Sequence, residues 1–142
     1  VERSFRRIDP TVPRVFTGET ARPAESQSTF TSGDLIEVTL TLRSQRAFDY
    51  LMLEDYLPAG CEAQDRGAMD PWEWSYWWCN QITRDRSVGF AIKHLDPGVQ
   101  RLTYRLSAQL PGRYTALPPQ VYDMYNPLNR GEGIAQVITI RP

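Results

Sequence analysis

A cysteine and a glutamine three residues apart form the spacing in this sequence that most suggests covalent chemistry. They stand in residues 57–64, LPAGCEAQ, as Cys61 and Gln64 behind a Pro-x-Gly. An internal thioester joins a Cys sulfur to a Gln carbonyl at this separation, in sequences of the form Pro-x-Gly-Cys-x-Glu-Gln. Here the order is Cys-Glu-Ala-Gln, and the preceding YLMLEDY is strand-like with no helix after it. We therefore interpret the segment as a strand that ends in a Pro-Gly turn.

Other catalytic and metal-binding patterns are absent from the sequence. His94 is the single histidine and lies in a strand-like stretch, which favours a surface or edge position over a general base. No Gly-x-Ser-x-Gly marks a nucleophilic serine. One histidine, two cysteines and scattered carboxylates do not give the spacing of a zinc or calcium site. We expect no catalytic residue, no metal and no cofactor, and therefore no enzyme.

The two cysteines, Cys61 and Cys79, leave two interpretations open. They permit one disulfide, which in an oxidising compartment would contribute about 3 kcal/mol by restricting the unfolded chain. Two reduced, buried thiols fit the composition equally well. The choice depends on whether the two Cβ vectors meet, which sequence does not determine.

All four tryptophans fall in one short segment, PWEWSYWWCN. In an extended strand, every second ring from Trp72 to Trp78 shares one face and Trp77 points to the other. Such a ladder favours core packing or contact with a neighbouring domain, with a sugar-stacking platform as the alternative. The candidate interdomain or ligand surface consists of Trp72, Trp74, Trp77 and Tyr122.

A second aromatic segment, VYDMYNP, places Met124 and Tyr125 in a polar, proline-containing stretch. Apolar side chains are costly to leave in water, so this pair should cover something. Two alternatives remain open. The pair forms either a flap over the domain's own core or a plug for a site on another domain.

Alternating apolar residues identify the strands that must position these side chains. The clearest period of two is in DLIEVTLTLRS, and VGFAIKHL and VQRLTYRLSAQL repeat it. Weaker strand signals lie at residues 1–8, 49–55, 76–79, 113–115 and 134–140. Residues 9–31 and 116–133 are polar and rich in proline, and we expect long loops there. Seven or eight short strands with frequent turns predict an all-β, antiparallel β-sandwich.

The composition limits the partners of the chain. Its 142 residues fit a single domain, and a net charge of −1 without basic clusters argues against nucleic acid. No apolar run approaches the length of about 18 residues that spans a membrane, and we expect no signal peptide and no membrane contact by this domain. Because Val1 already lies in a strand-like pattern, residues 1–142 are expected to be a piece of a longer protein.

Several segments together resemble the C-terminal macroglobulin-like domain of bacterial alpha-2-macroglobulins. The most specific match is a Leu-Pro followed by Met-Tyr-x-Pro after a Pro-Gly turn, which LPPQVYDMYNP fits. The other matching segments cover essentially the whole chain: VERSFRR, TFTSGDLIEVTLTLRS, YLMLEDYLPAGCE, WSYWW, RDRSVGFA, LDPGVQRLTYRLSAQLPGRYTA and RGEGIAQVITI.

This resemblance implies a non-catalytic domain of a broad-range protease inhibitor in the periplasm or cell envelope, whose parent can be a membrane-anchored lipoprotein. In that family a thioester, where there is one, lies in a separate helical domain. The family's Met-Tyr pair shields it from water, a role that would fall on Met124 and Tyr125. The implied partners are the thioester domain and, through the whole protein, target proteases. A free-standing carbohydrate-binding β-sandwich that uses the tryptophans is the alternative.

Overall fold

The computed structural model describes residues 1–9, 26–64 and 79–142, and these residues form twelve β-strands. No helix in these three ranges is long and apolar enough to cross a membrane. The strands, in chain order, are β1 (Glu2–Ile8), β2 (Thr29–Thr31), β3 (Leu35–Ser44), β4 (Phe48–Tyr56), β5 (Cys61–Ala63), β6 (Cys79–Thr83), β7 (Ser87–Leu95), β8 (Gly98–Ala108), β9 (Gly112–Ala116), β10 (Gln120–Asp123), β11 (Arg130–Glu132) and β12 (Gln136–Arg141).

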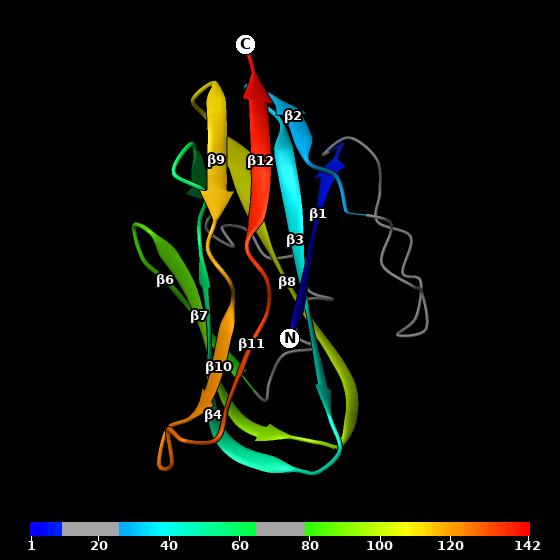
Figure 1. The fold of residues 1–142 in the computed structure, drawn as a ribbon, viewed down its shortest axis with the longest axis vertical. Helices are drawn as coiled ribbons and strands as arrows, with labels where there is room; N and C mark the ends of the chain where they lie inside the picture. The colour runs from blue at the N-terminus through cyan, green and yellow to red at the C-terminus, as the bar shows by residue number, and fades with distance from the viewer. Residues whose placement is uncertain (10–25, 65–78) are drawn as a thin grey trace.

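The strands form three hydrogen-bonded sheets arranged in two layers (Figure 1). One layer is the sheet β1-β3-β8-β5. The other layer contains the sheets β11-β10-β4-β7-β6 and β2-β12-β9. In Figure 1, β9 runs on into β10 and β11 runs on into β12 along the long axis, so these two sheets lie end to end. The β10–β11 hairpin therefore forms one end of the molecule, away from the β8–β9 turn.

One hydrophobic core joins the layers. β3 and β8 supply their alternating apolar side chains, and the facing sheets supply theirs, among them Phe90 from β7 and Ile138 from β12. All of these side chains are essentially inaccessible to solvent. The period of two in the sequence is thus explained by strands that bury one face against a second layer.

The predicted all-β sandwich is confirmed, with three differences in detail. The described residues contain twelve strands and not seven or eight, because short strands escape a search for apolar alternation. The expected loop at 9–31 ends in β2, and the expected loop at 116–133 contains β10 and β11. β2 pairs with β12 in parallel, whereas the other strand pairs are antiparallel. Strands of three or four residues hold too few alternating positions to be recognised, and backbone pairing defines them instead.

The LPAG turn has a packing reason for its glycine. A Cβ at Gly60 would lie 2.2 Å from the ring of Tyr114 and 2.9 Å from the carbonyl oxygen of Leu110. The Gly60 carbonyl accepts the amides of Gln109 and Leu110 at 2.9 and 3.1 Å. The Tyr114 hydroxyl lies 3.1 and 3.2 Å from the Leu110 and Pro111 carbonyls. Gly60 therefore lets the turn before β5 close against the turn that connects β8 and β9.

We predict that Gly60→Ala lowers the free energy of unfolding by about 1–3 kcal/mol, because the added methyl group meets the Tyr114 ring. Urea denaturation of the variant measures this loss. In a Tyr114→Ala background most of the cost of Gly60→Ala should disappear, since the ring is gone. Equal losses in both backgrounds would show that the ring contact is not the cause.

Candidate functional site

Met124 and Tyr125 lie in the loop of the β10–β11 hairpin, and both side chains are exposed. Their exposed fractions are 37% for Met124 and 82% for Tyr125. The structure therefore does not place Tyr125 over the domain's own core. The other alternative, a plug for a site on another domain, stays a prediction.

Hydrogen bonds hold the backbone of this exposed loop. The Asp123 carboxylate accepts the amides of Tyr125 and Asn126 at 2.9 and 3.2 Å. The Asn129 amide donates to the Asn126 carbonyl at 2.9 Å, and the Asp123 amide donates to the Asn129 carbonyl at 3.0 Å. An aspartate that binds amides two and three residues ahead is a common means of fixing a turn. The loop thus presents its apolar side chains from a defined backbone.

Tyr50, at the same end of β4, contacts this loop and was not singled out by the sequence. Its carbonyl accepts the Met124 amide at 3.0 Å. Its ring meets the Tyr125 ring edge to face, with centroids 5.5 Å apart and planes at 87°. We call Tyr50, Met124 and Tyr125 the aromatic patch. A tyrosine within a strand is ordinary in sequence, so no signal could have marked it.

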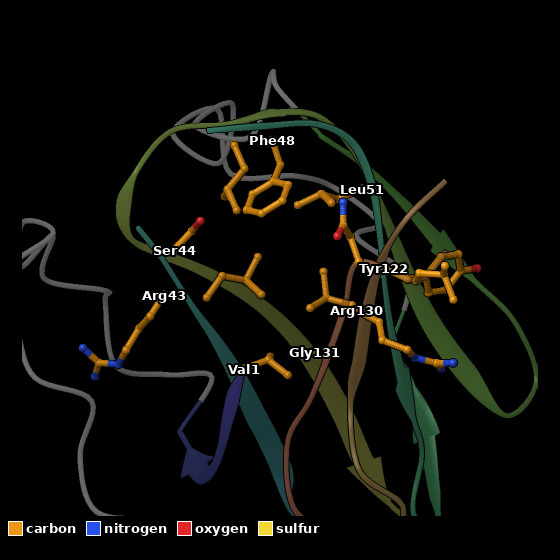
Figure 2. Close-up of a pocket in the computed structure, with 13 residues that line it drawn as sticks. Val1, Arg43, Ser44, Phe48, Leu51, Tyr122, Arg130 and Gly131 are labelled. Carbon is orange, nitrogen blue, oxygen red and sulfur yellow. The ribbon is translucent and has the colours of Figure 1, made fainter. Parts of the chain in front are cut away.

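A pocket of about 340 Å³ lies between the layers beside this hairpin (Figure 2). Figure 2 shows Phe48 and Leu51 on one side of it and Val1 and Gly131 on the other. The remaining lining residues are Leu42, Arg43, Ser44, Leu95, Val121, Tyr122, Leu128, Asn129 and Arg130. The pocket separates the hairpin from the β3–β4 turn, and its lining is largely apolar.

Tyr122 is the described member of the predicted aromatic surface. It lines the pocket and is half-buried in β10. Partial burial, together with the nearby charge of Glu54, raises the pKa of its phenol. The other members, Trp72, Trp74 and Trp77, lie outside the described residues.

A buried ion pair connects the two layers. Arg3 of β1 contacts the carboxylate of Asp55 in β4, and their side chains are 1% and 0% exposed. The Tyr104 hydroxyl of β8 donates to the second Asp55 oxygen at 2.6 Å. Burial raises the pKa of Asp55, against the opposing effects of the Arg3 charge and the hydrogen bonds. Burial also raises the pKa of Tyr104 well above its ordinary value, so Tyr104 remains a hydrogen-bond donor.

The remaining donors of Arg3 bind the chain segments that lead to the hairpin. They reach the carbonyls of Leu117, Ala116 and Ile134 at 2.8, 3.1 and 3.4 Å. The Arg3 Nε donates to the Gln136 side chain at 2.9 Å. These residues lie at the β9–β10 and β11–β12 links, so a single guanidinium fixes both stems of the hairpin. In the sequence, Arg3 is one of several charged residues in a polar strand. The sequence therefore did not reveal its buried role.

His94 lies at the surface between two carboxylates. Its Nδ1 is 2.6 Å from Asp49 and its Nε2 is 2.9 Å from Asp96. Hydrogen bonds to Asp49 first and then to Asp96 raise the pKa of His94 above 6.5. Both ring nitrogens are engaged, which leaves no free nitrogen for a general base. Within the described parts of the chain, no group of three His, Cys, Asp or Glu side chains could hold a metal ion.

Cys61 and Gln64 are not arranged as a thioester. Cys61 lies in β5, and the pairing with β8 continues to the Gln64 amide, which donates to the Arg105 carbonyl at 2.9 Å. Residues three apart in an extended chain point to opposite faces. Cys61 is a free, buried thiol, and burial raises its pKa to about 11. The thiol is therefore protonated and a poor nucleophile.

Cys61 forms no disulfide in this structure. Cys79 begins β6 at the far edge of the other layer, and its side chain lies outside the described residues. At Cys61 the structure therefore contains a reduced thiol.

The sheet order and the two layers define an all-β sandwich domain. A family model described as Bacterial Alpha-2-macroglobulin MG10 domain matches residues 1–127, so the chain belongs to this family. An alpha-2-macroglobulin homolog from Nostoc sp. is 30% identical over 109 residues, which are 70% of this chain and 6% of that protein. The chain thus spans only a small part of this curated relative.

Two solved structures have the same fold. Escherichia coli alpha-2-macroglobulin activated by porcine elastase is 25% identical with a TM-score of 0.70, over 83% of this chain and 12% of that chain. Native Escherichia coli alpha-2-macroglobulin, spanning domain MG7 to the C-terminus, is 23% identical with a TM-score of 0.77, over 99% of this chain and 23% of that chain. The second likeness concerns the fold alone.

We predict that Asp55→Asn lowers the free energy of unfolding by about 3–5 kcal/mol, because it leaves the buried Arg3 charge without a counter-ion. Glu2→Gln is the matched control. It breaks the 3.5 Å pair with Arg43, whose partners are 68% and 59% exposed, and should cost less than about 1 kcal/mol. Chemical denaturation of both variants tests this, and similar losses would contradict the role given to the buried pair.

We also predict that His94 titrates above 6.5, and that Asp49→Asn lowers this pKa more than Asp96→Asn. Because the folded-state pKa exceeds the unfolded value, the stabilisation is fully present below the unfolded pKa. It is lost as pH rises through the folded pKa. An NMR titration of the imidazole protons measures all three values. A His94 pKa at or below 6.5 in the original chain would refute the two-carboxylate clamp.

Proposed function

We propose that this chain is a non-catalytic domain, residues 1–142, of a longer bacterial alpha-2-macroglobulin-like protease inhibitor. Its Met124–Tyr125 loop docks on the domain that carries a thioester and keeps water from it in the resting protein. Family membership supports the coarse part of this proposal. The exposed aromatic patch supports the finer part.

The observation that carries the proposal is Tyr125, 82% exposed on a loop whose backbone is tied by the Asp123 carboxylate. Exposed apolar side chains that adjoin one another mark interaction sites more often than isolated ones do. A loop that merely tolerated exposure would not need a fixed backbone. The neighbouring Met124 and Tyr50 are 37% and 51% exposed and extend the apolar surface.

The chemistry of a thioester explains why such a cover is needed. Hydrolysis requires a water molecule at the acyl carbon, and packed Met and Tyr side chains exclude it. Release of the loop by a domain movement would expose the acyl group to an attacking protease. One Escherichia coli relative is described as activated by porcine elastase, and we extend that mode of activation to the parent of this chain.

The protonation and hydrogen bonding of the two most reactive side chains agree with a structural role and not a catalytic one. The Cys61 thiol is buried with a raised pKa, and both nitrogens of His94 are bonded. The partners in this proposal are therefore the other domains of the same protein and, through them, target proteases. The proposal places the parent in the periplasm or cell envelope, where it can be held as a membrane-anchored lipoprotein.

We predict that Tyr125→Ala in the full-length parent raises the rate of spontaneous thioester hydrolysis roughly tenfold. This is the effect of losing an aromatic contact worth about 1.4 kcal/mol. The released cysteine thiol is measured with a chromogenic disulfide reagent in the absence of protease.

Leu110→Ala is the matched control for that experiment. Leu110 is 62% exposed, but it lies at the β8–β9 turn, at the end of the molecule away from the hairpin (Figure 1). It should leave the rate unchanged. An unchanged rate in the Tyr125→Ala protein would count against the shielding role.

A further inference from the structure

Tyr50 has a backbone conformation that side chains rarely adopt. Its φ is 57°, and it is the one non-glycine residue with positive φ among the described residues. An L residue in this left-handed region brings its Cβ against the following carbonyl, which is unfavourable. Its neighbours Asp49 and Leu51 keep regular pairing with His94 and Ile92 of β7. The distortion is therefore confined to one residue within an otherwise regular strand.

Tyr50 does not belong to the buried core, and 51% of the residue is exposed. The contacts that Tyr50 makes in this conformation are with the β10–β11 hairpin. The Tyr50 carbonyl meets the Met124 amide at 3.0 Å, and its ring meets the edge or face of the Tyr125 ring at 5.5 Å. Strained residues persist where the surrounding structure determines them, and they gather at functional sites.

The two halves of the loop are held in different ways. Asp123 fixes the backbone amides of Tyr125 and Asn126, but these bonds leave the Tyr125 side chain free to rotate. The contact that the structure gives the Tyr125 ring is with Tyr50. Edge-to-face packing of this kind restricts a ring beyond what area burial does.

We infer that Tyr50 is the positioning residue of Tyr125. Its left-handed backbone anchors the Met124 amide, and its ring holds the Tyr125 ring in one orientation before any partner arrives. The side chain then loses less conformational freedom on docking. The role of this orientation in shielding rests on the proposed function. The orientation itself depends only on contacts within this chain and can be tested without the parent protein.

The test replaces Tyr50 by residues that separate backbone from ring. Tyr50→Gly accepts the positive φ without strain and deletes the ring. Tyr50→Asn is a second variant, because Asn is among the residues that tolerate this region. Tyr50→Phe is the matched control, since it keeps the ring and its edge-to-face contact.

NMR of this 142-residue chain decides the positioning role. Tyr50→Gly and Tyr50→Asn should abolish the ring-current contribution of Tyr50 to the Tyr125 proton shifts and the NOE contacts between the two rings, while the core methyl shifts stay unchanged. Tyr50→Gly should leave the midpoint of thermal unfolding the same or higher. Tyr50→Phe should retain the Tyr125 shift. A Tyr125 shift that persists in both ring-deleted variants overturns the proposal.

Thiol release in the full-length parent then separates this inference from the proposed function. Tyr50→Gly should raise the rate of release by roughly two- to tenfold, and Tyr50→Phe should not. If Tyr125→Ala itself leaves the rate unchanged, the shielding function fails while a lost NMR shift still supports the positioning role. If Tyr125→Ala raises the rate but Tyr50→Gly does not, orientation by Tyr50 has no part in shielding and that part of the inference is overturned.

Discussion

The buried ion pair between Arg3 and Asp55 is the interaction on which the rest of the architecture depends. It joins β1 of one layer to β4 of the other, with side chains that are 1% and 0% exposed. A buried ion pair adds little net stability over apolar packing, but it demands one geometry, because either charge alone would be very costly. Here the geometry includes both stems of the β10–β11 hairpin, since Arg3 also binds the carbonyls of Leu117 and Ile134. The placement of the loop is therefore set from inside the sandwich.

This arrangement fixes an exposed loop through hydrogen bonds and one ring contact. The hairpin lies at one end of the molecule (Figure 1), and Tyr125 in its loop is 82% exposed. Its stems are fixed by Arg3, its turn by the Asp123 carboxylate and its outer aromatic by Tyr50. An outward-facing patch that is ordered before contact pays less entropy when a partner covers it. The order of the loop and the exposure of Tyr125 together support a docking role.

The sequence predicted the architecture well wherever a strand alternates over many residues, as in β3, β7 and β8. It also marked Met124 and Tyr125, because an apolar pair in a polar segment is unusual. It did not reveal the short strands β10 and β11, which backbone pairing defines. Nor did it reveal Arg3, Asp55 or Tyr50, since their roles arise from contacts between distant segments and from a single φ angle. The LPAG turn was identified correctly, but the reason for Gly60 is its close approach to Tyr114, a residue of the sequence-distant strand β9.

We propose that the Met124–Tyr125 loop is covered in the resting parent protein and free after activation. Oxidative footprinting of Met124 measures this directly, because the side chain is 37% exposed in the chain described here. We predict slow oxidation in the resting parent, and rates after protease cleavage that match those of the 142-residue chain alone. Equal oxidation rates in the resting and cleaved parent would contradict it.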